Sequence, residues 1–295
     1  MGGPWQVRHV GPANSAARVA KVALAALAKV DLQMSTYRDD SDLMRLNRAP
    51  VGEWVCVPEE LIAVLQCARA VAVQSEGALD VTLGHTVNAW GFGPDPTPAN
   101  VPTRQDASQS YDLNAESLLV RKNTSFAFDL SALAKGYAVD QAALALEALG
   151  VGNFLVEAAG EIVTRGCCEG GSAWKIGLEL PVQGVSAPYD SVCVQDCALA
   201  TSGTYRNLRL IDGREFSHTF DRKTGAPVQS PLLSVTVLHQ SCMMADAWAT
   251  ALMVLGPVDG PHCAHKAALA AQFLIRTEGG LTEIRTEAFF EKICA

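Results

Sequence analysis

Apolar residues recur at helical spacing in two segments near the beginning of the chain. Residues 13–36 are rich in alanine, with apolar positions three and four residues apart, and they predict an amphipathic helix followed by a turn. Residues 58–76 predict a second helix, because Pro58 and two glutamates mark its first turn. The stretch GFGPDPTPANVP (91–102) holds too many prolines and glycines for regular structure and predicts a loop.

Shorter apolar runs predict strands that come in pairs around the helices. The expected strands are SFAFDL (125–130), a hairpin in NFLVEAAGEIVTRG (153–166), WKIGLEL (174–180), SVTVLH (234–239) and two more near 271–287. The run at 234–239 alternates and is β-branched, which is typical of a strand. A helix from about 131 to 149, ended by Gly150, separates the first strand from the hairpin. This order favours an α+β fold over a doubly wound sheet.

One apolar segment carries two polar side chains that need an explanation. SCMMADAWATALMVLG (241–256) predicts a helix in which Asp246 and Thr250, four residues apart, share one face. The apolar neighbours predict that this face is buried, and a buried carboxylate needs a cation or several hydrogen-bond donors. A carboxylate and a hydroxyl suit Mg²⁺ when a carbonyl, water or phosphate oxygen completes the set. Alternatively, Asp246 caps the helix and Thr250 bonds back to its own helix.

Composition and charge narrow the class of protein. The chain has 295 residues, of which 49% are hydrophobic and 18% charged, enough for one large domain or two intimately joined halves. A formal net charge of −8 argues against a nucleic-acid partner. No run approaches the roughly 18 apolar residues that suggest a membrane span, and MGGPWQVRHV lacks the basic and apolar regions of a signal peptide.

The cysteines give a further indication of compartment. There are nine, with no CxxC pair, which argues against structural zinc and favours free thiols in a reducing compartment. We therefore expect a cytoplasmic protein. HCAH (262–265) brings two imidazoles and a thiol together, and it is either a metal site or a polar loop end after the stop at Gly256 and Pro257.

DLSALAKGYAVD (129–140) is a candidate phosphate-binding segment. Asp129 is expected to end a strand and Ser131 to cap the next helix, with Lys135 one turn into that helix. A lysine and free amides at a helix start commonly hold a phosphate. The alternative is an N-cap, a lysine in a C-terminal turn and a glycine required for packing.

The segment from 200 to 228 carries a second group of polar residues. ATSG (200–203) predicts a turn of small residues where backbone can approach a ligand, and IDGR (211–214) predicts a hairpin. HTFDRKTG brings His218 and Asp221 together before a glycine turn. Alternatively, this is a hairpin with a turn-forming aspartate and a hydrogen-bonded histidine.

Seven segments in fixed order resemble the ApbE family, the FAD:protein FMN transferases. They are MSTYRDDSDLMRLN (34–47), GALDVTLGHTVNAWGFGP (77–94), DLSALAKGYAVD (129–140), NFLVEAAGEI (153–162), ATSGTYRN (200–207), SHTFDRKTGAPV (217–228) and SVTVLHQSCMMADAWATAL (234–252). The similarity covers roughly residues 1–256. It implies one ApbE-type domain over 1–295, built of two joined T-fold-like α/β halves whose mixed or antiparallel sheets are flanked by helices.

The resemblance also implies a reaction. In that family FAD is split at its pyrophosphate, the FMN half passes to a threonine or serine hydroxyl of an acceptor flavoprotein, AMP leaves, and Mg²⁺ is required. It implies that Asp246, Thr250 and the main-chain oxygen of Ala132 bind the metal. The FAD contacts that it implies are Met1, Tyr37, Ala78, Leu79, Asp80, Asp129, Lys135, Thr219 and Phe220. His218 or Asp221 is the expected acceptor of the hydroxyl proton.

Two alternatives and three departures from the family pattern accompany this interpretation. The same site with water as nucleophile gives an FAD pyrophosphatase. The alternative that is not an enzyme is a flavin-binding module without catalysis. Ala159 stands where the family usually has glycine, Arg222 where it has proline, and His85 where proline is common. Family members are often exported lipoproteins, so a periplasmic location is the alternative if a leader was removed.

Overall fold

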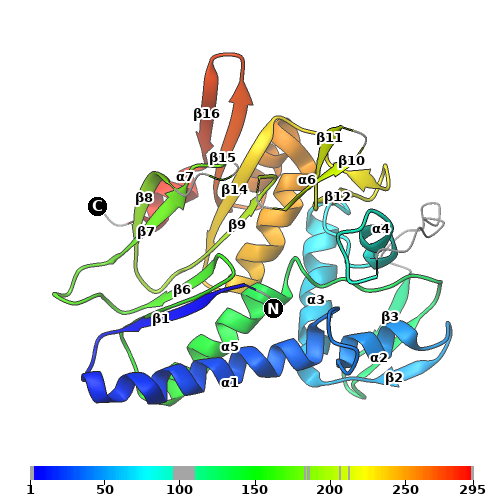
Figure 1. Ribbon diagram of the computed structural model, residues 1–295, viewed down its shortest axis with the longest axis horizontal. Helices are drawn as coiled ribbons and strands as arrows, with labels where there is room; N and C mark the ends of the chain where they lie inside the picture. The colour runs from blue at the N-terminus through cyan, green and yellow to red at the C-terminus, as the bar shows by residue number, and fades with distance from the viewer. Residues whose placement is uncertain are drawn as a thin grey trace.

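The computed structural model describes residues 3–95, 110–182, 184, 187–205, 207–211 and 213–293. Its main sheet has seven strands in the order β1-β5-β6-β9-β14-β15-β16, and every neighbouring pair is antiparallel (Figure 1). The strands are β1 (Trp5–His9), β5 (Phe154–Ala158), β6 (Glu161–Arg165), β9 (Ala198–Gly203), β14 (Leu232–His239), β15 (Ala270–Thr277) and β16 (Gly280–Arg285).

Each face of this sheet is covered by different elements. Helices α1 (Ala16–Met34), α5 (Ala134–Ala148) and α6 (Cys242–Lys266) form the layer on one face, with α1 and α5 side by side (Figure 1). The hairpin of β7 (Trp174–Glu179) and β8 (Pro188–Val194) and helix α7 (Glu287–Lys292) cover the opposite face. In β14, Val235 and Val237 belong to the core under the helices, whereas Leu238 belongs to the core on the opposite face. This alternation follows from the two-residue period of a strand.

The remaining elements lie beyond α3 (Glu59–Gln74), which packs against α6 (Figure 1). They are α2 (Asp42–Arg48), β2 (Trp54–Cys56), α4 (Gly84–Ala89), β3 (Tyr111–Asn114), β4 (Leu119–Lys122), β10 (Leu208–Ile211), β11 (Arg214–Ser217), β12 (Phe220–Asp221) and β13 (Ala226–Pro227). The short helix η1 (Ala13–Ser15) instead directly precedes α1. β2, β4 and β3 form a small sheet, and β10–β11 and β12–β13 are two-stranded hairpins. The pair β10–β11 confirms the hairpin expected at IDGR.

The beginnings of α5 and α6 are joined closely. A Cβ atom on Gly136 would lie 2.3 Å from the carbonyl oxygen of Cys242 and 2.8 Å from Cα of Met243, so only glycine fits. One turn later, the Asp140 carboxylate accepts hydrogen bonds from Ser241 Oγ at 2.7 Å and from the Cys242 and Met243 amides at 2.8 and 3.0 Å. A negative charge is favourable at a helix N-terminus, so Asp140 fixes the start of α6 against α5.

The periodic segments of the sequence predicted most of these elements. The helices expected at 13–36 and 58–76 are α1 and α3, and the hairpin at 153–166 is β5–β6. The strands expected at 174–180, 234–239 and near 271–287 are also present, which confirms the α+β class. The loop expected at 91–102 lies partly outside the described residues.

Three local expectations were wrong. Residues 125–130 form no strand; their contact is one isolated parallel bridge between Leu83 and Ala127, and α5 begins at Ala134 without a cap from Ser131. ATSG (200–203) is not a turn but lies in β9, where it pairs with the buried strand β14. Both strand errors concern partners far away in the chain, because ATSG pairs with β14 whereas residues 125–130 have only the single bridge to Leu83.

The third error concerns the residues of α6 that follow Gly256. The helix is interrupted at Gly256 as expected, because φ of 80° and ψ of −169° are not helical, but a second helical segment follows it and ends at Lys266. HCAH (262–265) therefore lies on a helix rather than in a loop, and no cluster of three or more metal-ligating side chains occurs among the described residues. Within the same part of the chain, no helix has the length and apolar character needed to cross a membrane.

Candidate functional site

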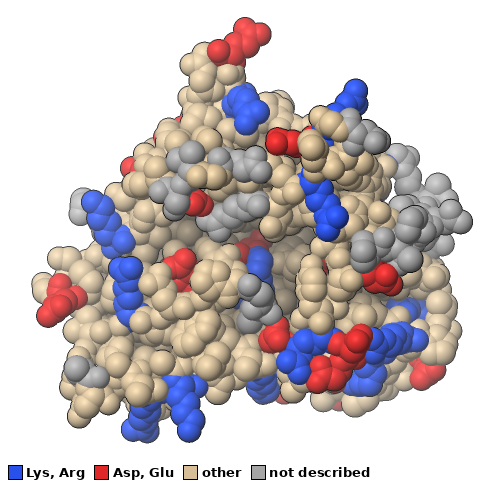
Figure 2. Space-filling view, viewed as in Figure 1, with Lys and Arg blue, Asp and Glu red and all other residues tan. Residues whose placement is uncertain are grey.

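A cavity of about 700 Å³ lies where the sheet, the beginnings of α5 and α6, and the β10–β13 hairpins meet. The face of the molecule in Figure 2 is hollowed near its centre, with positive and negative side chains inside the hollow. The candidate residues from the sequence that line this cavity are Tyr37, Ala78, Leu79, Asp80, Asp129, Ala132, Lys135, His218, Thr219, Phe220, Asp246 and Thr250. Residues spread over more than 200 positions of the chain are thus brought to one site.

Two candidates are not among the lining residues. Met1 lies outside the described residues. Asp221 forms the turn between β12 and β13, where its Oδ1 accepts from the Lys223 amide at 2.8 Å and its carbonyl oxygen from the Gly225 amide at 2.8 Å. Of the two expected proton acceptors, only His218 borders the cavity.

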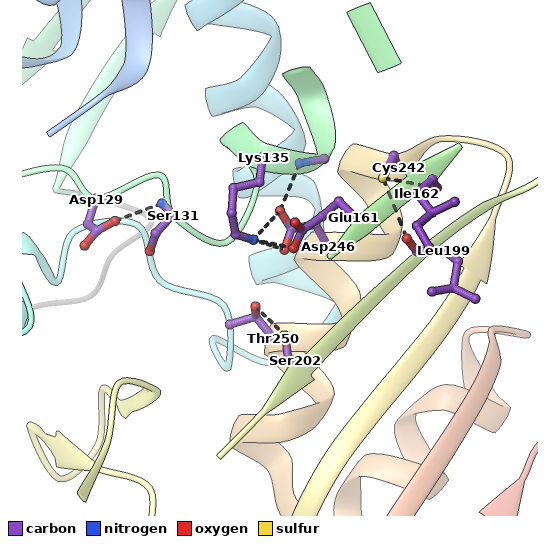
Figure 3. Close-up of polar contacts among 11 residues, drawn as sticks. Asp129, Ser131, Lys135, Glu161, Ile162, Leu199, Ser202, Cys242, Asp246 and Thr250 are labelled. Atoms are coloured by element: carbon purple, nitrogen blue, oxygen red, sulfur yellow. Dashed lines mark hydrogen bonds and ion pairs between the residues drawn. The ribbon is translucent and has the colours of Figure 1, made fainter. Parts of the chain in front are cut away.

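Lys135 joins two buried carboxylates at the floor of the cavity. Its Nζ lies 2.6 Å from Oε1 of Glu161 and 3.0 and 3.1 Å from Oδ1 and Oδ2 of Asp246 (Figure 3). The Gly136 amide donates a further hydrogen bond to Asp246 at 3.1 Å. The N-cap of α6 is Ser241, whose side chain accepts from the Met244 amide, so Asp246 does not cap the helix. Lys135 therefore supplies part of the positive charge that was expected beside Asp246.

One ammonium faces two carboxylates in this cluster, and burial together with these charges shifts the pKa of Lys135 and the pKa of Glu161. Burial alone would lower the pKa of Lys135, but the charges of Asp246 and Glu161 outweigh it and raise that pKa. Burial raises the pKa of Glu161 to about 7, although Lys135 opposes the shift. Glu161 Oε2 has no hydrogen-bond partner among the described residues. The cluster is therefore deficient in positive charge and in hydrogen-bond donors.

Glu161 was not singled out from the sequence, although it lies in one of the segments that carry the resemblance. It is the first residue of β6 and is 3% exposed. The sequence pattern that identified Asp246 also applies to Glu161, because both are carboxylates within an apolar segment. It was overlooked because a hairpin turn normally tolerates a charged residue, and only the fold shows that this one points inward.

Thr250 lies one turn after Asp246 on the same face of α6. Its hydroxyl pairs with Ser202 Oγ on β9 at 3.1 Å (Figure 3). Ser202 also lines the cavity, so the second half of the mispredicted ATSG segment reaches the site from a strand. The i, i+4 spacing thus places both oxygen donors at the cavity, as the sequence indicated.

Asp129 and Asp80 belong to two neighbouring loops. The Asp129 amide donates to the Val81 carbonyl at 2.9 Å, and Asp129 Oδ1 accepts from the Ser131 amide at 2.8 Å, which shapes the turn before α5 (Figure 3). Asp80 Oδ1 accepts from the Thr82 amide and hydroxyl at 2.8 and 2.7 Å. Both loops hold a carboxylate at the cavity through the backbone that surrounds it.

Arg222, one of the departures from the family pattern, forms an ion pair with Asp80. Its Nε lies 3.1 Å from Asp80 Oδ2, and the Asp80 side chain is only 1% exposed. A buried carboxylate of this kind needs a paired cation. The arginine that replaces proline thus pairs with a carboxylate of the cavity wall.

His218 borders the cavity and is half-buried, with Nδ1 enclosed by the protein. Nδ1 has no hydrogen-bond partner within the described part of the chain, while the ring also bonds to the Asn207 backbone. Burial lowers the pKa of His218, and the positive charge of Lys135 lowers it further. The imidazole is therefore neutral near pH 7 and can accept a proton.

The donor set of the cavity fits a magnesium ion. Mg²⁺ prefers oxygen ligands and usually takes one or two carboxylates together with waters and substrate phosphates. Asp246 and Thr250 supply such oxygens, and the main-chain oxygen of the lining residue Ala132 is a third candidate. The excess negative charge and the unpartnered oxygen of Glu161 agree with a cation binding nearby.

Comparisons with known proteins identify close relatives over nearly the full length. The model of the ApbE family matches residues 1–273. The FAD:protein FMN transferase of Vibrio cholerae serotype O1 is 38% identical over 270 residues, or 89% of this chain and 81% of that protein. The FAD:protein FMN transferase of Salmonella typhimurium is 34% identical over 292 residues, or 95% of this chain and 83% of that protein.

Two solved structures share the fold. Flavin transferase ApbE from Vibrio cholerae has a TM-score of 0.87 at 34% identity, covering 99% of this chain and 96% of that chain. Pseudomonas stutzeri flavinyl transferase ApbE in its apo form has a TM-score of 0.86 at 34% identity, covering 99% and 93% respectively. The overall fold is thus common to all three chains.

Proposed function

The chain belongs to the ApbE family, and from this premise we propose that it transfers the FMN part of FAD to a threonine or serine hydroxyl of an acceptor flavoprotein. AMP is the other product, and the reaction depends on Mg²⁺. The observation that carries the proposal is the convergence of Asp246, Thr250 and Lys135 on one cavity that His218 also borders. This is the constellation that attack on a diphosphate requires.

Different residues of the cavity would bind the flavin ring, the diphosphate and the metal ion. Tyr37, Ala78 and Leu79 offer apolar and aromatic surface to a flat ring, and Asp129 can accept hydrogen bonds from ring amines or sugar hydroxyls. Asp80 has both oxygens engaged by Thr82 and Arg222, and it contributes to the cavity wall. Lys135 faces the diphosphate, because it is the cation at the floor of the cavity. Asp246, Thr250 and the Ala132 carbonyl would hold Mg²⁺, which neutralises charge on the diphosphate oxygens when bound.

The bond changes balance without a further reactant. The acceptor oxygen forms a bond to the phosphorus of the FMN part, the bond from that phosphorus to the bridging oxygen breaks, and AMP leaves with the electron pair. His218, which borders the cavity, takes the hydroxyl proton. With water in place of the hydroxyl, the same bond changes would give FMN and AMP.

Mass spectrometry of an acceptor tests the proposal directly. The protein is incubated with FAD, Mg²⁺ and a flavoprotein subunit bearing the target threonine, and the same subunit with valine at that position is the control. We expect an FMN-sized addition on the threonine protein only, with one AMP released per addition. Release of FMN and AMP without modification would identify a pyrophosphatase, and FAD that is bound but intact would identify a binding module.

Replacement of Lys135 by alanine is expected to weaken FAD binding by roughly 10- to 100-fold, because a charge-assisted hydrogen bond contributes about 1.5–3 kcal/mol. Quenching of flavin fluorescence measures the dissociation constant without turnover. Lys175→Ala is the matched control, since Lys175 is exposed on β7 away from the cavity. An unchanged affinity for FAD in Lys135→Ala would exclude the lysine from the diphosphate site.

A further inference from the structure

Glu161 is a buried carboxylate for which neither the expected metal ligands nor the expected FAD contacts give a role. It is 3% exposed, lines the cavity, and has one oxygen without a partner in the described part of the protein. A buried carboxylate costs several kcal/mol unless it is well paired. Its partner is Lys135, at 2.6 Å. The pairing with this lysine is therefore where its role should be sought.

Lys135 and a metal ion bound by Asp246 would compete for the same carboxylate oxygens. Its ammonium is 3.0 and 3.1 Å from the two Asp246 oxygens, so it contacts both of them. Two unit positive charges 4 Å apart repel each other by about 4 kcal/mol at an effective dielectric constant of 20, and a divalent ion doubles this. When Asp246 accepts a divalent cation, the ammonium must therefore move away from that carboxylate.

Glu161 is the second carboxylate within reach of the displaced ammonium. The Glu161 oxygen is already closer to Nζ than either oxygen of Asp246 is, and its Oε2 is unpartnered among the residues described. Its strand, β6, pairs with β5 and β9 inside the main sheet, so the backbone at Glu161 is held in place on both sides. The lysine can thus leave Asp246 without losing its charged partner or the cavity.

We propose that Glu161 is a positioning residue that retains Lys135 at the cavity floor when Asp246 binds the divalent cation. Metal and lysine can then face the same diphosphate. The identity of both ligands rests on the proposed function, but the role of Glu161 concerns the exchange of partners at Lys135. Without Glu161, Lys135 keeps Asp246 as its only carboxylate partner in this cluster and opposes metal binding.

A double-mutant cycle on Mg²⁺ binding tests this role without turnover. Dissociation constants for Mg²⁺ alone are measured by titration calorimetry for the wild type, Glu161→Gln, Lys135→Met and the double variant. We expect Glu161→Gln to weaken Mg²⁺ binding at least tenfold more when Lys135 is present than when it is methionine. Equal weakening in both backgrounds would overturn the proposal, because Glu161 would then act as a direct ligand or by its charge alone.

Two further measurements separate positioning from a merely structural role. The FAD dissociation constant in EDTA and the unfolding temperature of Glu161→Gln should stay close to those of the wild type, whereas a damaged fold would change both. Glu157→Gln, on the neighbouring strand β5, is the matched control and should leave Mg²⁺ binding unchanged. If the wild type binds Mg²⁺ and FAD but transfers no FMN, the proposed function fails while the inference about Glu161 is still tested.

Discussion

Replacement of Asp246 by alanine is expected to reduce FMN transfer by at least about 10³-fold, with little change in the fold. A metal acting as a Lewis acid contributes several kcal/mol to a reaction of this kind, and 1.36 kcal/mol corresponds to a factor of ten in rate. Asp246 supplies the only carboxylate of the expected metal set, so its loss removes the strongest oxygen donor. Lys135 and Glu161 are left as a pair of opposite charge, which limits the cost to stability.

The measurement is the initial rate of FMN addition to an acceptor at several Mg²⁺ concentrations. Asp259→Ala is the matched control, because Asp259 is an exposed aspartate on the same helix. We expect the control to retain the full rate and the Mg²⁺ dependence of the wild type. If Asp246→Ala also retained them, the metal would have to bind elsewhere.

Gly136→Ala is expected to destabilise the protein by about 3 kcal/mol or more. Helix propensity alone predicts the opposite sign, because alanine in place of glycine usually stabilises a helix by about 1 kcal/mol. Here the added Cβ would meet the carbonyl oxygen of Cys242 at 2.3 Å, and a backbone atom cannot rotate away. Overpacking of this kind typically costs about 1–3 kcal/mol, and the hydrogen bond from the Gly136 amide to Asp246 is lost as the helices separate.

Chemical unfolding monitored by circular dichroism measures this effect. Gly152→Ala is the control, since a Cβ atom at Gly152 would meet nothing within 4 Å. The control should unfold at nearly the same denaturant concentration as the wild type, and Gly136→Ala at a clearly lower one. Stabilisation of Gly136→Ala would mean that the helices can separate without cost.

The sequence predicted those features that depend on local periodicity. Apolar spacing located α1 and α3, and alternation located β14, because the solvent-facing and core-facing sides of these elements differ in polarity. The same reasoning found Asp246 and Thr250, since two polar residues on a buried helix face stand out from their neighbours. The resemblance to the ApbE family then identified the other expected cavity residues, which lie far apart in the chain.

The sequence did not predict features that depend on pairing between distant segments. ATSG has the composition of a turn, yet β14 holds it in the sheet and thereby brings Ser202 to Thr250. Glu161 follows a hairpin turn, where a charged residue is normally solvated, and only the packing of α5 and α6 buries it. Local propensity carries no information about such partners.

The contact between α5 and α6 also determines which part of the enzyme can adjust to its substrates. Gly136 and Asp140 hold the beginnings of both helices together, so the backbone that carries Lys135 and Asp246 at the base of the cavity is fixed. The opposite rim consists of two short hairpins and the turn around Tyr37, a residue that is 72% exposed. Entry of a bulky dinucleotide and of an acceptor protein therefore has to be accommodated by the rim, while the backbone at the base stays in place and only side chains such as that of Lys135 change partners.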